Sequence, residues 1–428
     1  MMIRIFNAKI LSRDNGLIDN GEMWIEDGKI TFVSNVSPLI LKPWDREINL
    51  NGNLIMPSFK NAHTHSPMTF LRSYADDLPL DRWLFETVFP NEAKLQGDDY
   101  YWLSRLAILE YLSSGISVVS DMYFNLNTIG DAFVDSGMRN VILEGITTGN
   151  GPRDVLYKRL DEGKAYLDNR AGLIDYRLGI HAEYTNTKES LQDLADYANQ
   201  NKMPVYVHMS ETKKEVNECI GRYNVTPVKL FDEMGLWNYG GTLYHAVHTT
   251  EEDREIIKKR NLSVVSNPAS NLKLASGIAP LVDYVERGIN VGLGTDGPAS
   301  NNSLDMFREM YLATTLQKYL REDASALDAN IVLDMATKNG AKAMGLEGLD
   351  GIYIGAKADV IAIDLNQPNM QPINNIEKNL VYAGNKSNVF MTIINGEIKY
   401  EKGNYYVGED VDKIYSEANR IAQRIKNS

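Results

Sequence analysis

The chain has 428 residues, of which 43% are hydrophobic and 24% charged, so it is a folded globular protein too long for one small domain. Its net charge of -13 at pH 7 opposes binding to the phosphate backbone of nucleic acids and to anionic lipid. We therefore expect a small-molecule substrate, with no nucleic acid and no membrane as partners.

The sequence contains no unbroken apolar stretch of the ~18 residues that span a bilayer, and its first residues do not have the apolar core of a signal peptide. The single cysteine, Cys219, cannot form an intramolecular disulfide, and we interpret it as a buried apolar side chain. Together these features predict a cytoplasmic protein.

Short strands that alternate apolar and polar side chains are predicted for residues 3–33, with turns at 14–16 and 27–28. From Leu54 onward the pattern changes to brief apolar runs separated by longer amphipathic segments, which is typical of parallel strands joined by helices. Eight such runs are found, at residues 54–63, 117–124, 139–146, 177–184, 204–211, 242–248, 262–268 and 290–296.

Alternating strands return after Gly351, with a hairpin signal at Asn395-Gly396, and the last residues, 411–428, have the periodicity of a surface helix. This order predicts an α/β fold in which a (β/α)8 TIM-type barrel is inserted into a small β-sandwich formed by both chain ends. The expected boundaries are 1–56 for the first part of the sandwich, 57–350 for the barrel, and 351–428 for the rest of the sandwich plus the terminal helix.

The histidines are the main candidates for chemistry, because all six lie at or just beyond the ends of predicted barrel strands: His63, His65, His181, His208, His245 and His248. Active sites of this fold gather at the C-terminal ends of the strands. His63 and His65 are alternate residues of one strand, so both face one side of it. With Asp296 after the eighth strand, these imidazoles provide nitrogen and oxygen ligands suited to zinc with one open position.

Each signal has a simpler interpretation when it is taken alone. An isolated His-x-His pair is a weak metal signal, and Asp296-Gly297 is also a common turn sequence. His248 is more consistent with a structural role. A metal site is favoured only because histidines and an aspartate occur together at the C-terminal ends of several predicted strands.

Several long segments carry a family resemblance: MPSFKNAHTHSPMTFLRSYADDLPLDRWL, HMSET, SNPASNLKLASGIAPL, GTDGPASNNSLDMF, ATKNGAKAMGL and GAKADVIAIDL. The chain resembles the amidohydrolase superfamily, in its branch of S-adenosylhomocysteine and 5'-methylthioadenosine deaminases and triazine chlorohydrolases. The resemblance implies one Zn2+ per chain, or Fe2+ or Mn2+ in its place. Two-metal relatives carry a lysine after the fourth strand, and this sequence has none in its IHAEY segment.

The resemblance also assigns roles to individual residues. The metal ligands are His63, His65, His208 and Asp296; Glu211 is the general acid and base, and His245 lies beside the attacking water. The implied substrate contacts are Trp83, Glu92, Arg153, His181 and Ser300. Asp296 is expected to accept a proton from water and Glu211 to protonate the substrate ring.

Three positions depart from the family pattern. Ser266 stands where histidine is common, Glu144 where homocysteine-binding relatives have arginine, and Glu183 where many relatives have proline. Because an acidic group would repel a carboxylate, Glu144 argues against S-adenosylhomocysteine as the preferred substrate. The effects of Ser266 and Glu183 stay open.

The resulting hypothesis is a deaminase that releases ammonia from an adenine nucleoside or related purine. The alternatives are a chlorohydrolase or a guanine-type nucleobase deaminase, a hydrolase that opens a cyclic amide or guanidine, and a catalytically silent binding protein. Relatives are often oligomeric, which suggests a homo-oligomer.

Overall fold

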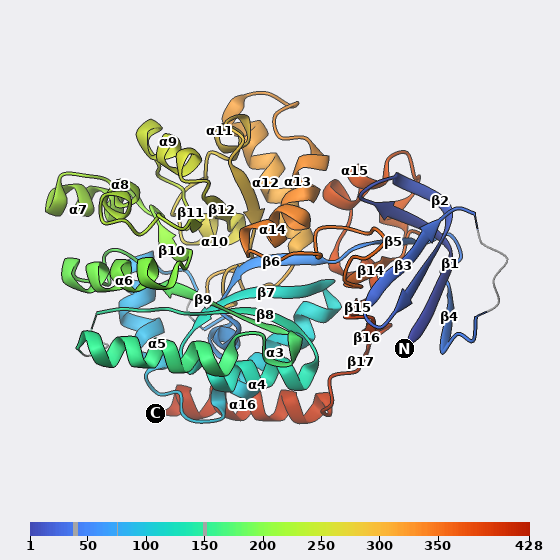
Figure 1. Cartoon of the computed structure of the whole chain (residues 1–428), viewed down its shortest axis with the longest axis horizontal. Coiled ribbons are helices and arrows are strands. Elements are labelled where there is room, and N and C mark those ends of the chain that lie inside the picture. The colour runs from blue at the N-terminus through green and yellow to red at the C-terminus, as the bar shows by residue number, and fades with distance from the viewer. Residues whose placement is uncertain (37–41, 75, 149–151) are drawn as a thin grey trace.

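The chain forms a barrel and a separate mixed β-sheet, and the computed structural model describes residues 1–36, 42–74, 76–148 and 152–428 (Figure 1). The barrel and its helices occupy one side of the molecule, and the sheet built from both chain ends lies on the other. This arrangement confirms the predicted fold class. The proposed domain boundaries remain a proposal.

The mixed sheet has nine strands in the order β17-β16-β15-β14-β5-β1-β2-β3, with β4 paired beside β1. Its first half contains β1 Met2–Ser12, β2 Gly16–Glu26, β3 Lys29–Ser34, β4 Arg46–Asn49 and β5 Leu54–Pro57; its second half contains β14 Val360–Ile363, β15 Val389–Ile394, β16 Glu397–Glu401 and β17 Asn404–Tyr405. The halves join where β5 pairs antiparallel with β14. Asn395 (φ 52°) and Gly396 (φ 75°) form the predicted hairpin turn, which requires positive φ at both positions.

The barrel contains eight parallel strands: β6 Phe59–Thr64, β7 Ile116–Tyr123, β8 Arg139–Glu144, β9 Ile174–Ile180, β10 Val205–Met209, β11 Gly241–His245, β12 Ser263–Ser266 and β13 Asn290–Leu293. Every residue of β6, β7, β10 and β12 is buried, as expected for strands covered on both faces. Hydrogen bonds close the seam between the first and last strands. Asp296 N donates to His63 O (2.9 Å), and Thr295 N donates to the Asn61 side chain (2.9 Å).

One predicted barrel strand was wrong in its extent. The apolar run 54–63 is divided at Ser58, so that β5 belongs to the mixed sheet and β6 to the barrel. Pro57 has no N–H to continue a ladder. Ser58 instead donates both its N–H (3.2 Å) and its hydroxyl (3.0 Å) to Asp359 O at the start of the C-terminal half.

Helices follow the barrel strands and surround them: α3 Asp99–Ser113, α4 Leu126–Ser136, α5 Arg153–Leu167, α6 Lys188–Asn201, α7 Lys213–Tyr223, α8 Pro227–Glu233, α9 Glu251–Lys259, α10 Pro268–Lys273, α11 Leu281–Glu286, α12 Met306–Arg321, α13 Ala329–Ala336 and α14 Lys338–Ala343. Several begin at a side chain that accepts a hydrogen bond from the first turn, including Thr187, Thr212 and Thr250. Short helical segments complete the chain: η3 Arg170–Gly172, η4 Pro368–Met370, α15 Ile376–Tyr382 and η5 Lys386–Asn388.

An insertion between β6 and α3 contributes to the wall of the central cavity. It contains η1 Ser66–Leu71, α1 Leu80–Arg82, the π-helical turn η2 Trp83–Val88 and α2 Phe89–Glu92. π-Helical turns are rare and often occur at functional sites. Here the turn begins at Trp83, which lines the cavity.

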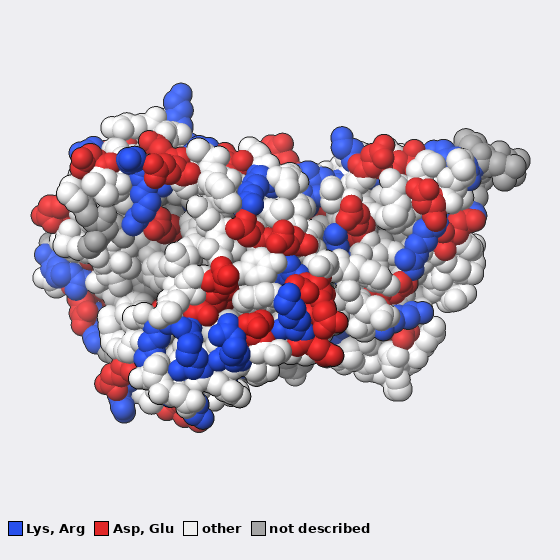
Figure 2. Space-filling view, turned by 90° about the horizontal axis from the view of Figure 1, so that it is seen from below, with Lys and Arg blue, Asp and Glu red and all other residues white. Residues whose placement is uncertain are grey.

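The terminal helix, α16 Val411–Asn427, leaves the mixed sheet and lies along the barrel beside α3 (Figure 1). Its buried side chains are spaced as one helical face, which confirms the predicted amphipathic surface helix. On the face of the molecule shown in Figure 2, acidic and basic side chains are interspersed. None of the described helices is both long and apolar enough to span a membrane.

Candidate functional site

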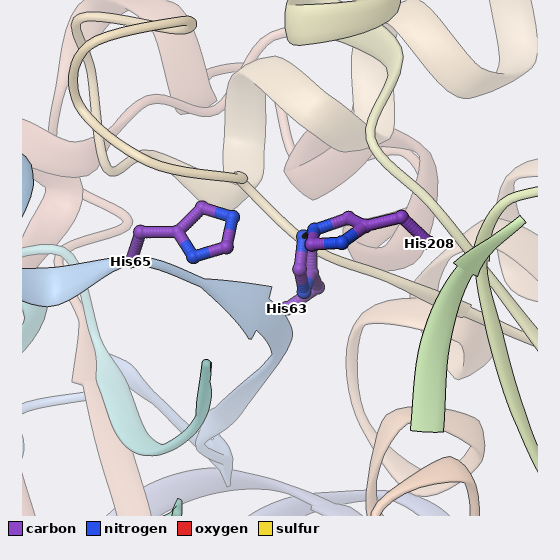
Figure 3. Close-up of side chains that lie close together, drawn as sticks. All are labelled: His63, His65 and His208. Atoms are coloured by element: carbon purple, nitrogen blue, oxygen red, sulfur yellow. Dashed lines mark hydrogen bonds between the residues drawn. The ribbon is translucent and has the colours of Figure 1, made fainter. Parts of the chain in front are cut away.

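Three histidines meet at the C-terminal mouth of the barrel. His63 lies on β6, His65 directly follows it, and His208 lies on β10 (Figure 3). One ring nitrogen from each is within 4.8 Å of the other two. Strand β6 brings two of the ligands together because alternate side chains of a strand share a face. The structure therefore gathers the predicted nitrogen donors around one point.

Asp296 lies beside this cluster, in the turn that follows β13. Its Oδ1 is 3.2 Å from His65 Nε2 and 3.6 Å from His63 Nε2. A Cβ at Gly294 would lie 2.8 Å from the His63 backbone nitrogen, too close for any side chain, and one at Gly297 would make a tight contact of 3.1 Å with the His65 Cβ. The Gly-Thr-Asp-Gly sequence is thus explained by close packing against the histidine strand.

Hydrogen bonds on the far side of two rings orient their ligand nitrogens. The Nδ1 of His65 donates to Met122 O (2.5 Å), and the Nδ1 of His208 donates to His181 O (2.6 Å). A carbonyl oxygen can only accept, so each Nε2 keeps its lone pair for the shared centre. His63 is held differently, by stacking on Tyr244 with ring centroids 3.9 Å apart.

The protonation states of the clustered histidines and of Asp296 favour the binding of a cation. Burial, together with the neighbouring histidines, lowers the pKa values of His63 and His208 well below the usual range and keeps both rings neutral. Burial alone would raise the pKa of Asp296, but the nearby imidazoles, His65 first, hold it well below its usual value. Burial alone would lower the pKa of His65, but Asp296 raises it, so a cation bound between the two would take the place of a proton on His65 Nε2. Neutral imidazoles and an ionised carboxylate are the protonation states that metal ligands need.

The distances fit the same conclusion. Ligand atoms at tetrahedral positions about 2.1 Å from one zinc ion are roughly 3.4 Å apart. The His63–His208 Nε2 pair is separated by 3.2 Å, and the Asp296 distances are 3.2 and 3.6 Å. These three separations match ligands of a single divalent metal ion, and the His65 nitrogen lies within 4.8 Å of the other two nitrogens.

The second carboxylate oxygen of Asp296 accepts two hydroxyl hydrogen bonds, from Ser270 (2.6 Å) and Ser300 (2.9 Å). The sequence predicted Ser300 to be a substrate contact, but the structure pairs it with Asp296. Ser270 was missed, because nothing in its segment distinguishes this serine from a solvated helix residue. Both hydroxyls fix the carboxylate so that its Oδ1 faces the histidines.

Glu211 and His245 lie next to each other beside the cluster. Glu211 Oε2 is 3.9 Å from His245 Nε2, and Ser276 donates its hydroxyl to Glu211 Oε1 (3.0 Å). On its other side His245 Nδ1 donates to the Asn271 side-chain oxygen (2.7 Å). Neither Ser276 nor Asn271 was singled out from the sequence.

These groups line a cleft that holds about 620 Å³, including the open solvent at its mouth. This is within the size range of small-molecule sites. Of the predicted residues, the cleft is lined by His65, Trp83, Glu92, His181, His208, Glu211, His245 and Asp296; apolar walls come from Met68, Leu80, Leu84, Phe89, Phe124 and Leu274.

Glu92 and Trp83 are buried polar groups in this wall. Tyr123 donates its hydroxyl to Glu92 (2.5 Å), and burial raises the pKa of Glu92 to about 7. The indole nitrogen of Trp83 is buried and has no hydrogen-bond partner among the described residues. His181, also in the wall, makes a 3.1 Å contact from Nδ1 to the Thr185 hydroxyl, and burial lowers the pKa of His181 to about 4.

Arg153 is not brought to the cleft. It is about half exposed at the start of α5 and forms ion pairs with Asp196 (2.7 Å) and Asp193 (3.4 Å) on α6. Arg153 follows residues 149–151, which lie outside the described part of the chain. The predicted substrate contact is therefore unsupported by its position.

Glu144 also points away from the cleft. Leu143 belongs to the cluster of side chains inside the barrel, so strand alternation directs Glu144 outward, where it pairs with Arg159 of α5 (3.2 Å). The expectation that Glu144 repels a substrate carboxylate loses its geometrical basis. Glu183 pairs with Arg222 of α7 (2.5 Å). Ser266 is buried at the end of β12.

The family profile and several similar proteins indicate the same family for this chain. The profile of the amidohydrolase family matches residues 54–399. The 5-methylthioadenosine/S-adenosylhomocysteine deaminase of Thermoanaerobacter pseudethanolicus is 38% identical, with 100% of this chain and 99% of the relative covered. The protein of the same name from Moorella thermoacetica is also 38% identical, over 98% of each chain.

Solved structures agree. An adenosine deaminase from Xanthomonas campestris with bound zinc superimposes with a TM-score of 0.92 at 30% identity, covering 100% of this chain and 99% of that one. An atrazine chlorohydrolase from Arthrobacter aurescens complexed with zinc shares the fold, with a TM-score of 0.89 at 20% identity and coverage of 98% and 100%. The extent of the sequence match and the single-metal geometry lead to one conclusion: the chain belongs to the amidohydrolase family.

Proposed function

We propose that this protein is a zinc-dependent hydrolytic deaminase that releases ammonia from adenine nucleosides. The observation that carries the proposal is the shared cleft. Its wall contains His65, His208 and Asp296 of the metal-ligand cluster, an adjacent carboxylate and imidazole, and a buried tryptophan and glutamate suited to a base and a sugar. The curated relatives, which are 38% identical over 98–100% of this chain, have names that support the same reaction.

Each polar group has a task in this reaction. Zinc, when bound, lowers the pKa of water to about 7 and so supplies hydroxide at neutral pH. Asp296 accepts the proton of the attacking water at a carboxylate oxygen. His245 orients the attacking oxygen, and Asn271 fixes the ring of His245 by accepting from its Nδ1 (2.7 Å).

Glu211 acts as the proton donor and acceptor. It protonates a ring nitrogen of the purine as the water oxygen bonds to the adjacent ring carbon, which makes that carbon electrophilic. The carbon then loses its amino group, and a proton transferred to that group allows it to leave as ammonia. The Ser276 hydroxyl, which donates to Glu211 Oε1, leaves Oε2 on the side of His245.

The choice of a nucleoside as substrate rests on Trp83 and Glu92, which line the cleft together with His181. The Trp83 ring supplies an aromatic surface for the purine. Glu92 accepts hydrogen bonds from sugar hydroxyls, in addition to the one from Tyr123. A nucleoside therefore fits this wall better than a chlorotriazine or a free nucleobase, neither of which carries a sugar.

The experiment is a measurement of ammonia release by the purified zinc-loaded protein from adenosine, deoxyadenosine, methylthioadenosine, S-adenosylhomocysteine, adenine, guanine and atrazine. S-Adenosylhomocysteine belongs in the panel because Glu144 is paired with Arg159. We expect turnover of one or more adenine nucleosides, with a product one mass unit heavier than the substrate. Turnover of guanine or atrazine alone would overturn the proposal, and a protein that neither binds metal nor turns over any substrate would be a silent scaffold.

Replacement of Glu211 by Gln tests the proton-transfer role. The variant keeps the size of the side chain but cannot carry the proton, so kcat is expected to fall by roughly 100- to 10,000-fold. Glu218→Gln, on the exposed face of α7, is the matched control and should keep kcat within about twofold. Equal kcat in the two variants would exclude Glu211 as the proton carrier.

A further inference from the structure

The turn that carries Glu211 is held by a second glutamate. Strand β10 ends at Met209, and Ser210 then adopts a φ of 52°, a left-handed conformation that is unfavourable for serine. Glu215, in the first turn of α7, is 5% exposed. Its Oε1 accepts from Ser210 N (2.6 Å), and its Oε2 accepts from Glu211 N (2.7 Å).

These hydrogen bonds fix the backbone of Glu211 directly. A weaker contact reaches Thr212 N (3.4 Å), so three successive N–H groups face one carboxylate. With its backbone held in this way, Glu211 places Oε1 against the Ser276 hydroxyl (3.0 Å) and Oε2 toward His245 (3.9 Å). A change in the turn would displace the carboxylate from both partners.

We propose that Glu215 is a positioning residue for Glu211, which sets the place of the proton-transfer carboxylate relative to His245. This inference rests on the proposed deaminase function for the role of Glu211. Glu215 itself is not among the described residues that line the catalytic cleft. Its effect is transmitted through the backbone of residues 210–212.

The simpler interpretation of Glu215 is a helix cap. Thr212 and Glu215 form a reciprocal capping box at the start of α7, and such boxes stabilise helices wherever they occur. The chain contains a matched case at α9, where Thr250 and Asp253 form the same box and Asp253 is 1% exposed.

The two boxes differ in what the carboxylate holds. Asp253 accepts from the N–H and hydroxyl of Thr250 (both 2.8 Å) and from the Thr226 hydroxyl. None of these groups belongs to a residue of the catalytic cleft. Glu215 instead reaches back two residues beyond its cap to Ser210. A purely structural role therefore predicts equal effects at the two boxes, whereas a positioning role predicts unequal effects.

The experiment compares Glu215→Ala and Glu215→Gln with Asp253→Ala in the full-length zinc-loaded protein. All three variants should lower the midpoint of urea denaturation. Glu215→Ala should lower kcat by roughly 10- to 100-fold, the range expected when a reacting group moves by about 1 Å, with KM changed less than about threefold. Glu215→Gln keeps one acceptor oxygen and should be intermediate, and Asp253→Ala should keep kcat within about twofold.

Crystal structures supply a readout that does not depend on turnover. In Glu215→Gln we expect Ser210 or Glu211 N to lose its acceptor and the Glu211 carboxylate to leave Ser276, with one zinc per chain retained. An unchanged Glu211 in that structure, or equal losses of kcat in Glu215→Ala and Asp253→Ala, would overturn the proposal. If the wild type deaminates no nucleoside, the proposed function fails, while the position of Glu211 in Glu215→Gln still decides whether Glu215 places it.

Discussion

The Glu92 carboxylate is buried in the cleft wall, where Tyr123 is its hydrogen-bond donor. Replacement by Gln keeps its size but removes the charge that strengthens hydrogen bonds from sugar hydroxyls. We expect Glu92→Gln to lower kcat/KM for adenosine by roughly 10- to 100-fold, which corresponds to a charged hydrogen bond of about 1.5–3 kcal/mol. The loss with 2',3'-dideoxyadenosine should be less than about threefold.

The ionisation of Glu92 gives this prediction a pH dependence. Burial raises the pKa of Glu92 to about 7, so the carboxylate gains its charge as the pH rises from 6 to 8. The ratio of wild-type to Glu92→Gln kcat/KM for adenosine should increase over this interval. An equal loss with adenosine and its dideoxy analogue, at any pH, would show that Glu92 does not hold the sugar hydroxyls.

The sequence was informative about residues whose positions follow from strand periodicity. His63, His65, His208 and Asp296 could be placed because the fold collects the C-terminal ends of its strands at one mouth. Ser270, Ser276 and Glu215 were missed. Each acts through a hydrogen bond to another segment or to backbone, and such bonds leave no periodic pattern in the sequence.

At Gly294, just after β13, the backbone approaches β6 so closely that a methyl group would not fit. A Cβ there would lie 2.5 Å from Asn267 Oδ1 and 2.8 Å from His63 N. Gly294→Ala should therefore separate Asp296 from His63 and weaken zinc binding by roughly 10- to 100-fold, the effect typical of disturbing the support of a metal ligand. Competition with a chromogenic chelator measures this affinity.

Gly221, within α7, is the matched control for that substitution. A Cβ at Gly221 would meet no atom of the described part of the chain within 4 Å, and alanine is the better helix former. Gly221→Ala should keep the zinc affinity of the wild type and increase stability by up to about 1 kcal/mol. If Gly294→Ala bound zinc as tightly as Gly221→Ala, the close approach of β13 to β6 would be unimportant for the site.

The elements themselves were largely predictable, and the exceptions have physical causes. Eight apolar runs gave eight parallel strands, since burial on both faces leaves a continuous apolar signature. The division of residues 54–63 at Ser58 was not visible, because β5 and β6 are equally buried in different sheets. Glu144 shows a different failure: similarity to relatives suggested a substrate contact, whereas strand alternation turns its side chain toward Arg159.

The junction of the barrel and the mixed sheet contains a buried lysine. The Lys60 ammonium donates to Ser58 O (2.9 Å) and to the Ser58 hydroxyl (2.7 Å), and the Arg139–Asp359 ion pair lies nearby. Burial lowers the pKa of Lys60 to about 8, despite the opposing charge of Asp359. The folded molecule thus disfavours the charged form of this side chain.

This environment predicts how stability changes with pH. Between pH 8 and 10.5 the unfolded chain holds the Lys60 proton more tightly than the folded one, so stability rises with pH in that interval. The free energy of unfolding of the wild type should gain on the order of 3 kcal/mol relative to Lys60→Met between pH 7.5 and 10.5. Urea denaturation of both proteins at the two pH values measures the difference, and parallel pH profiles would refute it.

The proposed chemistry depends on the barrel bringing four side chains, distant in the sequence, to one cation. The most direct measurement is a zinc-edge anomalous diffraction map from crystals of the zinc-loaded protein. We predict one peak per chain at the mouth of the barrel, about 2.0–2.2 Å from the Nε2 atoms of His63, His65 and His208 and from Asp296 Oδ1. A map with no peak among these four side chains, or with its only strong peak elsewhere, would contradict the assignment.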